Sequence, residues 1–492
     1  MSITRRDVAS LLVPVLKWEP GGGFNDLKPF ITDALELGVG GFKLVGGEQD
    51  AVRALAKEMQ QKSRHPLLIA ADLECGAGQQ FAGATGLPPL GAIGALGDME
   101  SLRRAARLTA REARTMGVNW NLAPVADLDL LDENPTLGSR ALGRDARKVG
   151  TLITAWIEAC QAEGVLACAK HFPGMGRAPV DPNMALPQID APADLLKDHD
   201  LVPFRSAISA GVASIMTAHG SFPAFDSSRT PATLSREIIQ WMLRQQFKYD
   251  NLVVTDSMTM KAVTDSRSSA DAAVLAIRAG CDVILDPEDL HATADALHAA
   301  VENGSLDVER VRMAMRRRLK WAQWASPPND WRRPSGADTA WGALLADRVL
   351  RIEHGPLPPI AAVTEVMIID DDSDVLGKRP DRQALLDAFR TGGTDARLVQ
   401  APGAASGGPL VIALFADNHA GKERTRLLPE TANAVRKAID DAAALQRSAV
   451  ILALGDPRYV AQLGIAIPTV IAWSGDRVMQ QAAARQLQRS KK

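Results

Sequence analysis

Short apolar runs alternate with amphipathic stretches along the first 320 residues of the chain. The run 252–254 (Leu-Val-Val) has strand character, whereas segment 48–61 repeats apolar residues at a helical spacing. This alternation predicts a parallel sheet whose strands are joined by helices. We expect strands near 10–16, 41–45, 67–71, 118–122, 165–169, 213–217, 252–254 and 282–285.

Eight strand–helix units are the number that forms a (β/α)8 barrel of the TIM type. The competing interpretation is an open, doubly wound sheet, but no strand is followed by a Gly-rich dinucleotide-binding motif. We therefore expect a (β/α)8 barrel over residues 1–325 and a smaller C-terminal α/β sandwich domain over 361–492. The Pro-rich runs 327–334 and 355–359 predict a linker over 326–360.

The composition adds limits to this picture. A formal net charge of −2 gives no basic surplus, so we expect no nucleic-acid partner. No stretch approaches the roughly 20 apolar residues of a membrane span. The four cysteines are scattered without metal-binding or disulfide-like spacing, which predicts a cytoplasmic location. These bulk properties leave the oligomeric state open.

Polar residues stand at the carboxyl ends of six predicted strands. In α/β barrels these ends form the active site. Each residue alone has a simpler explanation as a helix cap or a loop hydrogen-bonding group, but their convergence on one rim is harder to explain in that way. Such a rim of carboxylates, amides and cationic donors suits a polyhydroxylated ligand such as a sugar. The residues are Asp72, Asn121, Lys170 with His171, His219, Asp256 and Asp286.

The rim shows no pair of histidines at the spacing of a preformed metal site. The chain also lacks a Gly-rich loop that would bind phosphate. We expect neither a metal ion nor a cofactor.

Seven short motifs follow one another between residues 71 and 260. They are 71–74 (Ala-Asp-Leu-Glu), 121–127 (Asn-Leu-Ala-Pro-Val-Ala-Asp), 138–143 (Gly-Ser-Arg-Ala-Leu-Gly), 170–174 (Lys-His-Phe-Pro-Gly), 216–219 (Met-Thr-Ala-His), 231–235 (Pro-Ala-Thr-Leu-Ser) and 254–260 (Val-Thr-Asp-Ser-Met-Thr-Met). This ordered set resembles family 3 glycoside hydrolases, specifically the bacterial β-N-acetylhexosaminidases. The glucosidase branch usually carries an aromatic residue directly after the nucleophile, where this chain has Ser257.

The resemblance implies a retaining mechanism in which Asp256 is the nucleophile and forms a covalent glycosyl-enzyme. Neighbouring cations would hold its carboxylate ionised. The resemblance places His219 in the site region, and it implies sugar-hydroxyl ligands at Asp72, Arg140, Lys170 and His171.

The pattern departs from the family at the general acid/base. Family members carry Asp-Ser-His on the loop after the Lys-His-Phe-Pro-Gly motif, but this chain has Asp181-Pro182-Asn183, and Met175 replaces another common histidine. An amide has no proton to transfer near neutral pH.

Three interpretations of this departure stay open. Asp181 itself is the acid, if burial raises its pKa. Alternatively, the proton donor comes from elsewhere, such as the second domain or a partner chain. In the third, the protein is a catalytically weak or inactive sugar-binding pseudoenzyme.

Overall fold

The computed structural model describes residues 2–19, 21–325, 336–373, 380–403, 408–418, 422 and 424–490. The Pro-rich run 327–334, which predicted the start of a linker, lies outside these residues. The chain divides into two compact units. The first contains Met1–Thr85, Met99–Leu131 and Gly143–Ser335, and the second contains Gly86–Asp98, Asp132–Leu142 and Gly336–Lys492.

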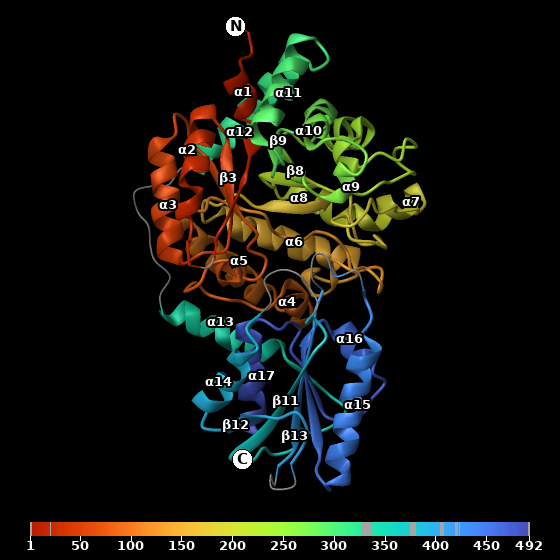
Figure 1. Ribbon diagram of the computed structural model, residues 1–492. Helices are drawn as coiled ribbons and strands as arrows, with labels where there is room; N and C mark the ends of the chain where they lie inside the picture. Colours follow the sequence, from red (N-terminus) through yellow and green to blue (C-terminus); the bar gives the residue numbers. More distant parts are fainter. Residues whose placement is uncertain are drawn as a thin grey trace. The chain divides into compact units, whose positions relative to one another are not determined.

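The first unit contains two parallel sheets (Figure 1). One has the order β1 (Leu12–Val13), β9 (Val283–Leu285), β8 (Leu252–Ser257), β7 (Ser214–Thr217), β6 (Cys168–Phe172). The other has the order β2 (Val15–Lys17), β3 (Gly41–Val45), β4 (Leu68–Ala71), β5 (Trp120–Asn121). The predicted mixed α/β fold with parallel sheets is therefore confirmed.

The first predicted strand is divided between the two sheets. Pro14 separates β1 from β2, and β1 pairs with β9 whereas β2 pairs with β3. A proline lacks the N–H group that a continuous ladder needs. On the other side, isolated parallel bridges join Trp120 to Leu166 and Val125 to Lys170. These contacts bring the neighbourhood of β5 against that of β6.

Helices connect the strands of the first unit, and several begin at a side-chain cap. Asp145 accepts the N–H groups of Arg147 and Lys148 at the start of α6, and Asp307 accepts that of Glu309 at the start of α12. These acceptors satisfy donors that the helix leaves unpaired. The longer helices are α2 (Lys28–Leu37), α3 (Gln49–Lys62), α5 (Met99–Thr115), α6 (Ala146–Gln161), α8 (Val202–Ser209), α10 (Ser269–Ala279), α11 (Leu290–Glu302) and α12 (Val308–Trp324).

Apolar side chains from both sheets of the first unit pack into one cluster. Trp120 and Trp321 are its two tryptophans, and the indole Nε1 of Trp120 donates to Ser214 Oγ at 2.8 Å. Strands buried on both faces are expected to be apolar throughout, which explains the uninterrupted runs in the sequence. The cluster includes Val13, Leu68, Leu122, Leu166, Met216, Val254, Val283 and Leu285. The polar strand ends begin where these residues stop.

The second unit contains a six-stranded sheet with the order β10-β15-β14-β13-β11-β12, in which β10 alone is antiparallel to its neighbour. Its strands are β10 (Arg351–Glu353), β11 (Val363–Asp370), β12 (Asp395–Leu398), β13 (Leu410–Ala416), β14 (Ala449–Gly455) and β15 (Thr469–Ile471). Its longer helices are α13 (Gly336–Val349), α14 (Gln383–Thr391), α15 (Pro429–Ala444) and α17 (Arg477–Arg489).

These units differ from the predicted division in two places. Residues 336–353 lie within the predicted linker span, and they form α13 and the strand β10, which pairs with β15. Segments 86–98 and 132–142 were expected in the barrel domain, but they belong to the second unit. The second of these segments contains η3 (Gly138–Arg140) and is held by Asp456, whose Oδ2 accepts the N–H of Ser139 at 2.9 Å.

None of the helices in the described part of the chain combines the length and the hydropathy that a membrane span requires.

Candidate active site

The carboxyl ends of four strands bring together most of the predicted site residues of the first unit. Asp72 follows β4, Lys170 and His171 belong to β6, His219 follows β7, and Asp256 belongs to β8. Asp72, His171 and Asp256 keep part of their side chains accessible, with exposures of 23%, 13% and 14%. These three side chains therefore keep some contact with solvent.

Two lysines hold Asp72. Lys170 Nζ lies 2.7 Å from Oδ1, and Lys43 Nζ lies 2.8 Å from Oδ2. Lys170 also bonds Glu74 Oε1 at 2.8 Å. Burial alone would raise the pKa of Asp72, but the two ammonium groups lower it well below its usual range. Burial alone would also lower the pKa of Lys43, and the neighbouring Asp72 carboxylate reverses this and raises it.

The pairing therefore keeps acceptors and donors charged side by side at the rim. An ionised carboxylate accepts hydrogen bonds from hydroxyls, and an ammonium group donates charge-assisted hydrogen bonds. This arrangement is chemically suited to a sugar with several adjacent hydroxyl groups.

Asp256 stands near the end of the buried strand β8. Its Oδ1 accepts the N–H of Ser257 at 2.8 Å, and its Oδ2 lies 3.8 Å from Nε2 of His171. Burial acts to raise the pKa of Asp256, but His171, His219 and the Ser257 N–H group together lower it. The carboxylate is therefore ionised at neutral pH.

His171 is oriented by a buried carboxylate that no role was predicted for. Its Nδ1 lies 2.7 Å from Oδ2 of Asp127, which has no exposed side-chain surface. Sequence reasoning also missed Lys43 and Glu74. The available signal for Lys43 was a single charged residue in the otherwise apolar strand β3, and Glu74 and Asp127 both stood inside motifs of the ordered set.

Three of the other rim residues hold the chain's own backbone and hydroxyl groups. The amide of Asn121 contacts the N–H and the carbonyl of Leu73 at 3.1 and 3.3 Å. Asp286 accepts the hydroxyl of Ser257 at 2.6 Å. His219 contacts Thr233 Oγ1 at 2.8 Å and the Ser257 carbonyl at 2.9 Å. For Asn121 and Asp286, this is the simpler role that any single strand-end residue allows.

His219 differs from His171 in its surroundings. It is buried, both ring nitrogens have partners within the protein, and burial lowers its pKa. Its imidazole is therefore neutral at neutral pH and joins the loop after β7 to the end of β8.

The loop that carries Asp181 is folded back on itself. Asp181 is 2% exposed, and its Oδ1 accepts both the backbone N–H and the side-chain amide of Asn183, at 2.7 and 2.8 Å. The carbonyl of Pro182 accepts the N–H of Ala262 at 3.0 Å. This contact ties the loop to α9 (Lys261–Thr264), which follows the strand of Asp256.

Arg140 belongs to the second unit, whereas the strand-end cluster described above comes from the first. Its Nη1 donates to the carbonyl of Thr136 at 2.8 Å within its own loop.

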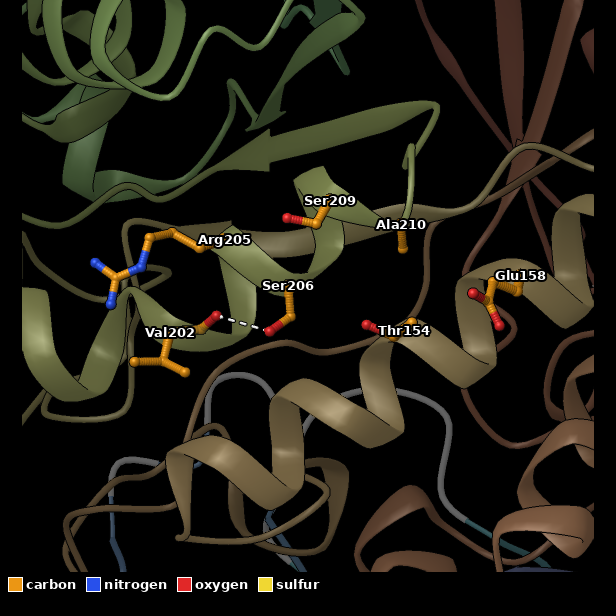
Figure 2. Close-up of a pocket in the computed structure, with 7 residues that line it drawn as sticks. All are labelled: Thr154, Glu158, Val202, Arg205, Ser206, Ser209 and Ala210. Carbon is orange, nitrogen blue, oxygen red and sulfur yellow. Dashed lines mark hydrogen bonds between the residues drawn. The ribbon is translucent and has the colours of Figure 1, made fainter.

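A surface hollow between α6 and α8 contains none of the predicted site residues (Figure 2). It is lined by Thr154, Glu158, Val202, Arg205, Ser206, Ser209 and Ala210, and the Ser206 hydroxyl donates to the Val202 carbonyl within α8. It presents two charged side chains and no strand end, so the strand-end cluster remains the candidate site.

Residues 34–320 match the model of the glycosyl hydrolase family 3 N-terminal domain, which is more than half of the chain. The chain belongs to glycosyl hydrolase family 3. Among relatives, a β-N-acetylglucosaminidase/β-glucosidase of Cellulomonas fimi is 34% identical over 58% of this chain and 52% of its own length. A β-hexosaminidase of Bordetella parapertussis is 33% identical over 57% of this chain and 80% of its own.

Solved structures agree with this family assignment. A family 3 β-N-acetylglucosaminidase of Paenibacillus sp. superposes with a TM-score of 0.84 at 26% identity, covering 99% of this chain and 96% of its own. The present family 3 chain spans about half the length of the Cellulomonas relative and of a β-hexosaminidase A of Pseudoalteromonas piscicida.

Proposed function

We propose that this family 3 chain is a retaining glycoside hydrolase that acts on β-linked N-acetylhexosaminides, with Asp256 as its nucleophile. The observation that carries the proposal is the ionised Asp256 carboxylate at the accessible end of β8, with His171 Nε2 at 3.8 Å. The names of the relatives, which are β-hexosaminidases and β-N-acetylglucosaminidases, support the choice of sugar.

In the proposed reaction, a carboxylate oxygen of Asp256 attacks the anomeric carbon. The bond from that carbon to the aglycone oxygen breaks, and the aglycone leaves with the bonding electrons. A water molecule then attacks the anomeric carbon of the glycosyl ester and loses its proton to solvent or to the group that protonated the aglycone. The bond from that carbon to the Asp256 oxygen breaks, the carboxylate is regenerated, and the sugar leaves with its original configuration.

Asp72, Lys170 and His171 are the proposed sugar ligands in the first unit, and Lys43 supports them by holding Asp72 in its ionised form. Their charges are favourable for hydroxyl recognition because carboxylates accept and ammonium groups donate strong hydrogen bonds. Arg140 remains a proposed sugar ligand on the strength of the resemblance alone. For His219, whose ring nitrogens are both occupied, we propose a role in holding the end of β8 in place of direct sugar binding.

Protonation of the aglycone is the step for which the chain has the least evident catalytic group. Asp181 is the proposed acid, although its Oδ1 already accepts the backbone N–H and the side-chain amide of Asn183. A donor from elsewhere, such as the second domain or a partner chain, is the alternative. In either case, aglycones that leave as stable anions are expected to be the best substrates, because they need no acid.

A second candidate function is favoured by Asn183 itself. Losing general acid catalysis typically slows a reaction about 10²–10⁴-fold. A barrel with intact ligands and a missing acid would bind an amino sugar and turn it over weakly, as a sugar-binding pseudoenzyme does.

For the fold, we propose that the two parallel sheets of the first unit are two arcs of one closed (β/α)8 barrel. Pro14 joins β1 to β2 along the chain, and the bridges near β5 and β6 supply contacts on the opposite side. We propose the C-terminal α/β sandwich as a separate domain, and the cytoplasmic location remains a prediction.

The experiment that tests the function compares two β-N-acetylglucosaminides. One carries a dinitrophenyl group, which leaves without protonation, and the other carries a sugar aglycone, which needs an acid. Turnover of the first alone supports Asp256 as nucleophile with a missing acid, and turnover of both supports a working acid, for which Asp181→Asn is the next variant. Turnover of neither, or activity that survives Asp256→Ala, contradicts the proposed hydrolase.

If neither substrate turns over, calorimetry with N-acetylglucosamine decides on the second candidate. Saturable heat supports the sugar-binding protein, and no heat with any amino sugar contradicts it.

A further inference from the structure

Asp127 is a buried carboxylate without a part in the reaction steps above, yet it lies against two elements of the candidate site. The backbone around it is fixed to β6. The N–H of Ala126 donates to the Lys170 carbonyl at 2.7 Å, and the N–H of Lys170 donates to the Pro124 carbonyl at 3.2 Å. The carboxylate therefore has a defined position relative to the residues that follow Lys170.

Both carboxylate oxygens of Asp127 accept N–H groups from segment 171–175. Oδ2 lies 2.7 Å from Nδ1 of His171, and Oδ1 accepts the N–H of Met175 at 2.7 Å. The backbone N–H of His171 lies 3.2 and 3.1 Å from Oδ1 and Oδ2. Because an ionised carboxylate can only accept, this geometry requires a hydrogen on Nδ1 of His171.

The opposite edge of the imidazole faces the nucleophile. Nε2 of His171 lies 3.8 Å from Oδ2 of Asp256. The two carboxyl groups of a retaining pair stand about 5–5.5 Å apart, on either side of the scissile bond. The shorter distance places His171 beside the nucleophile, where a ring that also carries a hydrogen on Nε2 supports the ionised carboxylate, and not across the bond where an acid would stand.

The same Asp127 holds the start of the loop that carries Asp181. The N–H of Gly174 donates to the His171 carbonyl at 2.8 Å, and that of Ala178 donates to the Met175 carbonyl at 3.0 Å. Gly176 approaches the Leu128 carbonyl so closely that a Cβ atom would lie 2.2 Å from its oxygen. The first turn of the loop is thus built against residues 127 and 128.

We propose that Asp127 is a positioning residue that fixes the Nδ1–H form of His171 beside Asp256 and anchors the first turn of the Asp181 loop. The inference rests on the proposed role of Asp256 as nucleophile. It adds a residue that acts through His171 without contacting the sugar.

Other titratable groups surround the same nucleophile and must be kept constant in a test. Asp256 faces His171 on β6, His219 after β7 and Lys43 on β3. Asp286, after β9, bonds the hydroxyl of the neighbouring Ser257. A substitution of Asp127 leaves all of these side chains in place.

The first experiment needs no turnover. The imidazole nitrogens of ¹⁵N-labelled protein are followed by NMR from about pH 5 to pH 9, with His171→Gln assigning the signals. We expect the neutral form of His171 to carry its hydrogen on Nδ1 in the wild type and to lose this preference in Asp127→Asn. A wild-type His171 with its hydrogen on Nε2 overturns the inference, even if the variant fails to fold.

The second experiment measures kcat/KM for the dinitrophenyl glycoside against pH. We expect Asp127→Asn to lower kcat about 10²-fold, the size of effect that a misplaced catalytic group produces, and to move the acid limb of the profile to higher pH. In a His171→Gln background, Asp127→Asn should add little. Fully additive losses, or an unchanged acid limb in a folded variant, contradict the inference.

Asp145→Asn is the matched control, because it alters a carboxylate of the same unit that caps α6 at the surface. It should leave the profile unchanged. If the wild type turns over no substrate, the proposed function fails, while the NMR result still decides whether Asp127 positions His171.

Discussion

Asn183 donates its side-chain amide to Oδ1 of Asp181 across 2.8 Å. The resemblance described above implies a histidine, oriented by an aspartate, at the position of Asn183. The chain thus keeps an aspartate contact to this position while the group it contacts can donate a hydrogen bond but no proton. The loop is folded, with Asp181 and Pro182 buried, so we infer that an asparagine at this position changes the chemistry of the loop without unfolding it.

Replacing Asn183 by histidine should restore an acid at the end of this contact. We expect Asn183→His to raise turnover of the sugar-aglycone substrate about 10²–10⁴-fold, and to change turnover of the dinitrophenyl substrate little. Steady-state kinetics on both substrates checks the prediction, with Asn183→Gln as a control that keeps an amide. An equal change for both substrates would show that the residue does not govern protonation.

Lys43 should affect sugar binding through Asp72. Lys43→Met removes one of the two ammonium groups that hold this carboxylate in place, so Asp72 should be less well aligned to accept a sugar hydroxyl. A lost bond to a charged group costs about 1.5–3 kcal/mol, which corresponds to a KM increase of roughly 10- to 100-fold. Lys62→Met, which alters an exposed ion pair with Glu58 on α3, is the control and should leave KM unchanged. A normal KM in Lys43→Met would remove Asp72 from the site.

The free energy of unfolding should decrease in two steps as the pH is lowered. Burial lowers the pKa of His219. Below the pKa of about 6.5 that this histidine has in the unfolded chain, the unfolded chain binds a proton on the imidazole that the folded chain does not bind. The depressed pKa values of Asp72 and Asp256 stabilise the fold above the unfolded value of about 4, and this contribution is lost as the pH falls further.

The variant His219→Gln isolates the first step. It should flatten the loss between about pH 6.5 and pH 5.5, where one histidine contributes at most about 1.4 kcal/mol per pH unit. Urea unfolding of both proteins at these two pH values measures the difference. The same slope in wild type and variant would mean that His219 does not titrate differently on folding.

Gly138 should be required for the loop that Asp456 holds. It has a φ of +49°, and a Cβ there would lie 1.9 Å from Asp456 Oδ2 and 2.4 Å from Asn418 Nδ2. Gly97 has a φ of +70° with nothing within 4 Å, so Gly97→Ala measures the backbone strain alone. Strain costs about 1–2 kcal/mol, and Gly138→Ala should lower the unfolding midpoint clearly more than Gly97→Ala does. Equal unfolding midpoints for Gly138→Ala and Gly97→Ala would show that the loop accommodates the added Cβ atom without losing stability.

The alternating pattern predicted the fold class because local periodicity reports which faces of a strand or helix are buried. The pattern did not predict strand bounds that depend on pairing with a strand distant in the sequence. The strand expected at 165–169 is observed as β6 at Cys168–Phe172, because its pairing with β7 begins at Cys168, which places Lys170 and His171 inside the strand. No feature of the local sequence predicts the register of β6 with β7.

The candidate site was also predicted only in part. Motifs supplied Asp72 and Asp256, since they stand directly at strand ends. The contacts of Asp72 to Lys43 and Lys170, and of Asp127 to His171, join residues 29 to 98 positions apart along the chain. A period of two or 3.6 residues carries no information about such pairs, so Lys43 was interpreted as an ordinary strand residue.

The second unit draws two of its segments, 86–98 and 132–142, from the first third of the chain and the rest from Gly336 onward. During synthesis the ribosome delivers these early segments long before the sheet that they join, and domains otherwise tend to fold in order from the N-terminus. The loop that carries Arg140 must therefore wait for Asp456 to emerge. A chain released before that point would lack Asp456, which accepts the N–H of Ser139 in the folded loop. The loop would then stay incompletely folded and accessible to a chaperone that binds nascent chains.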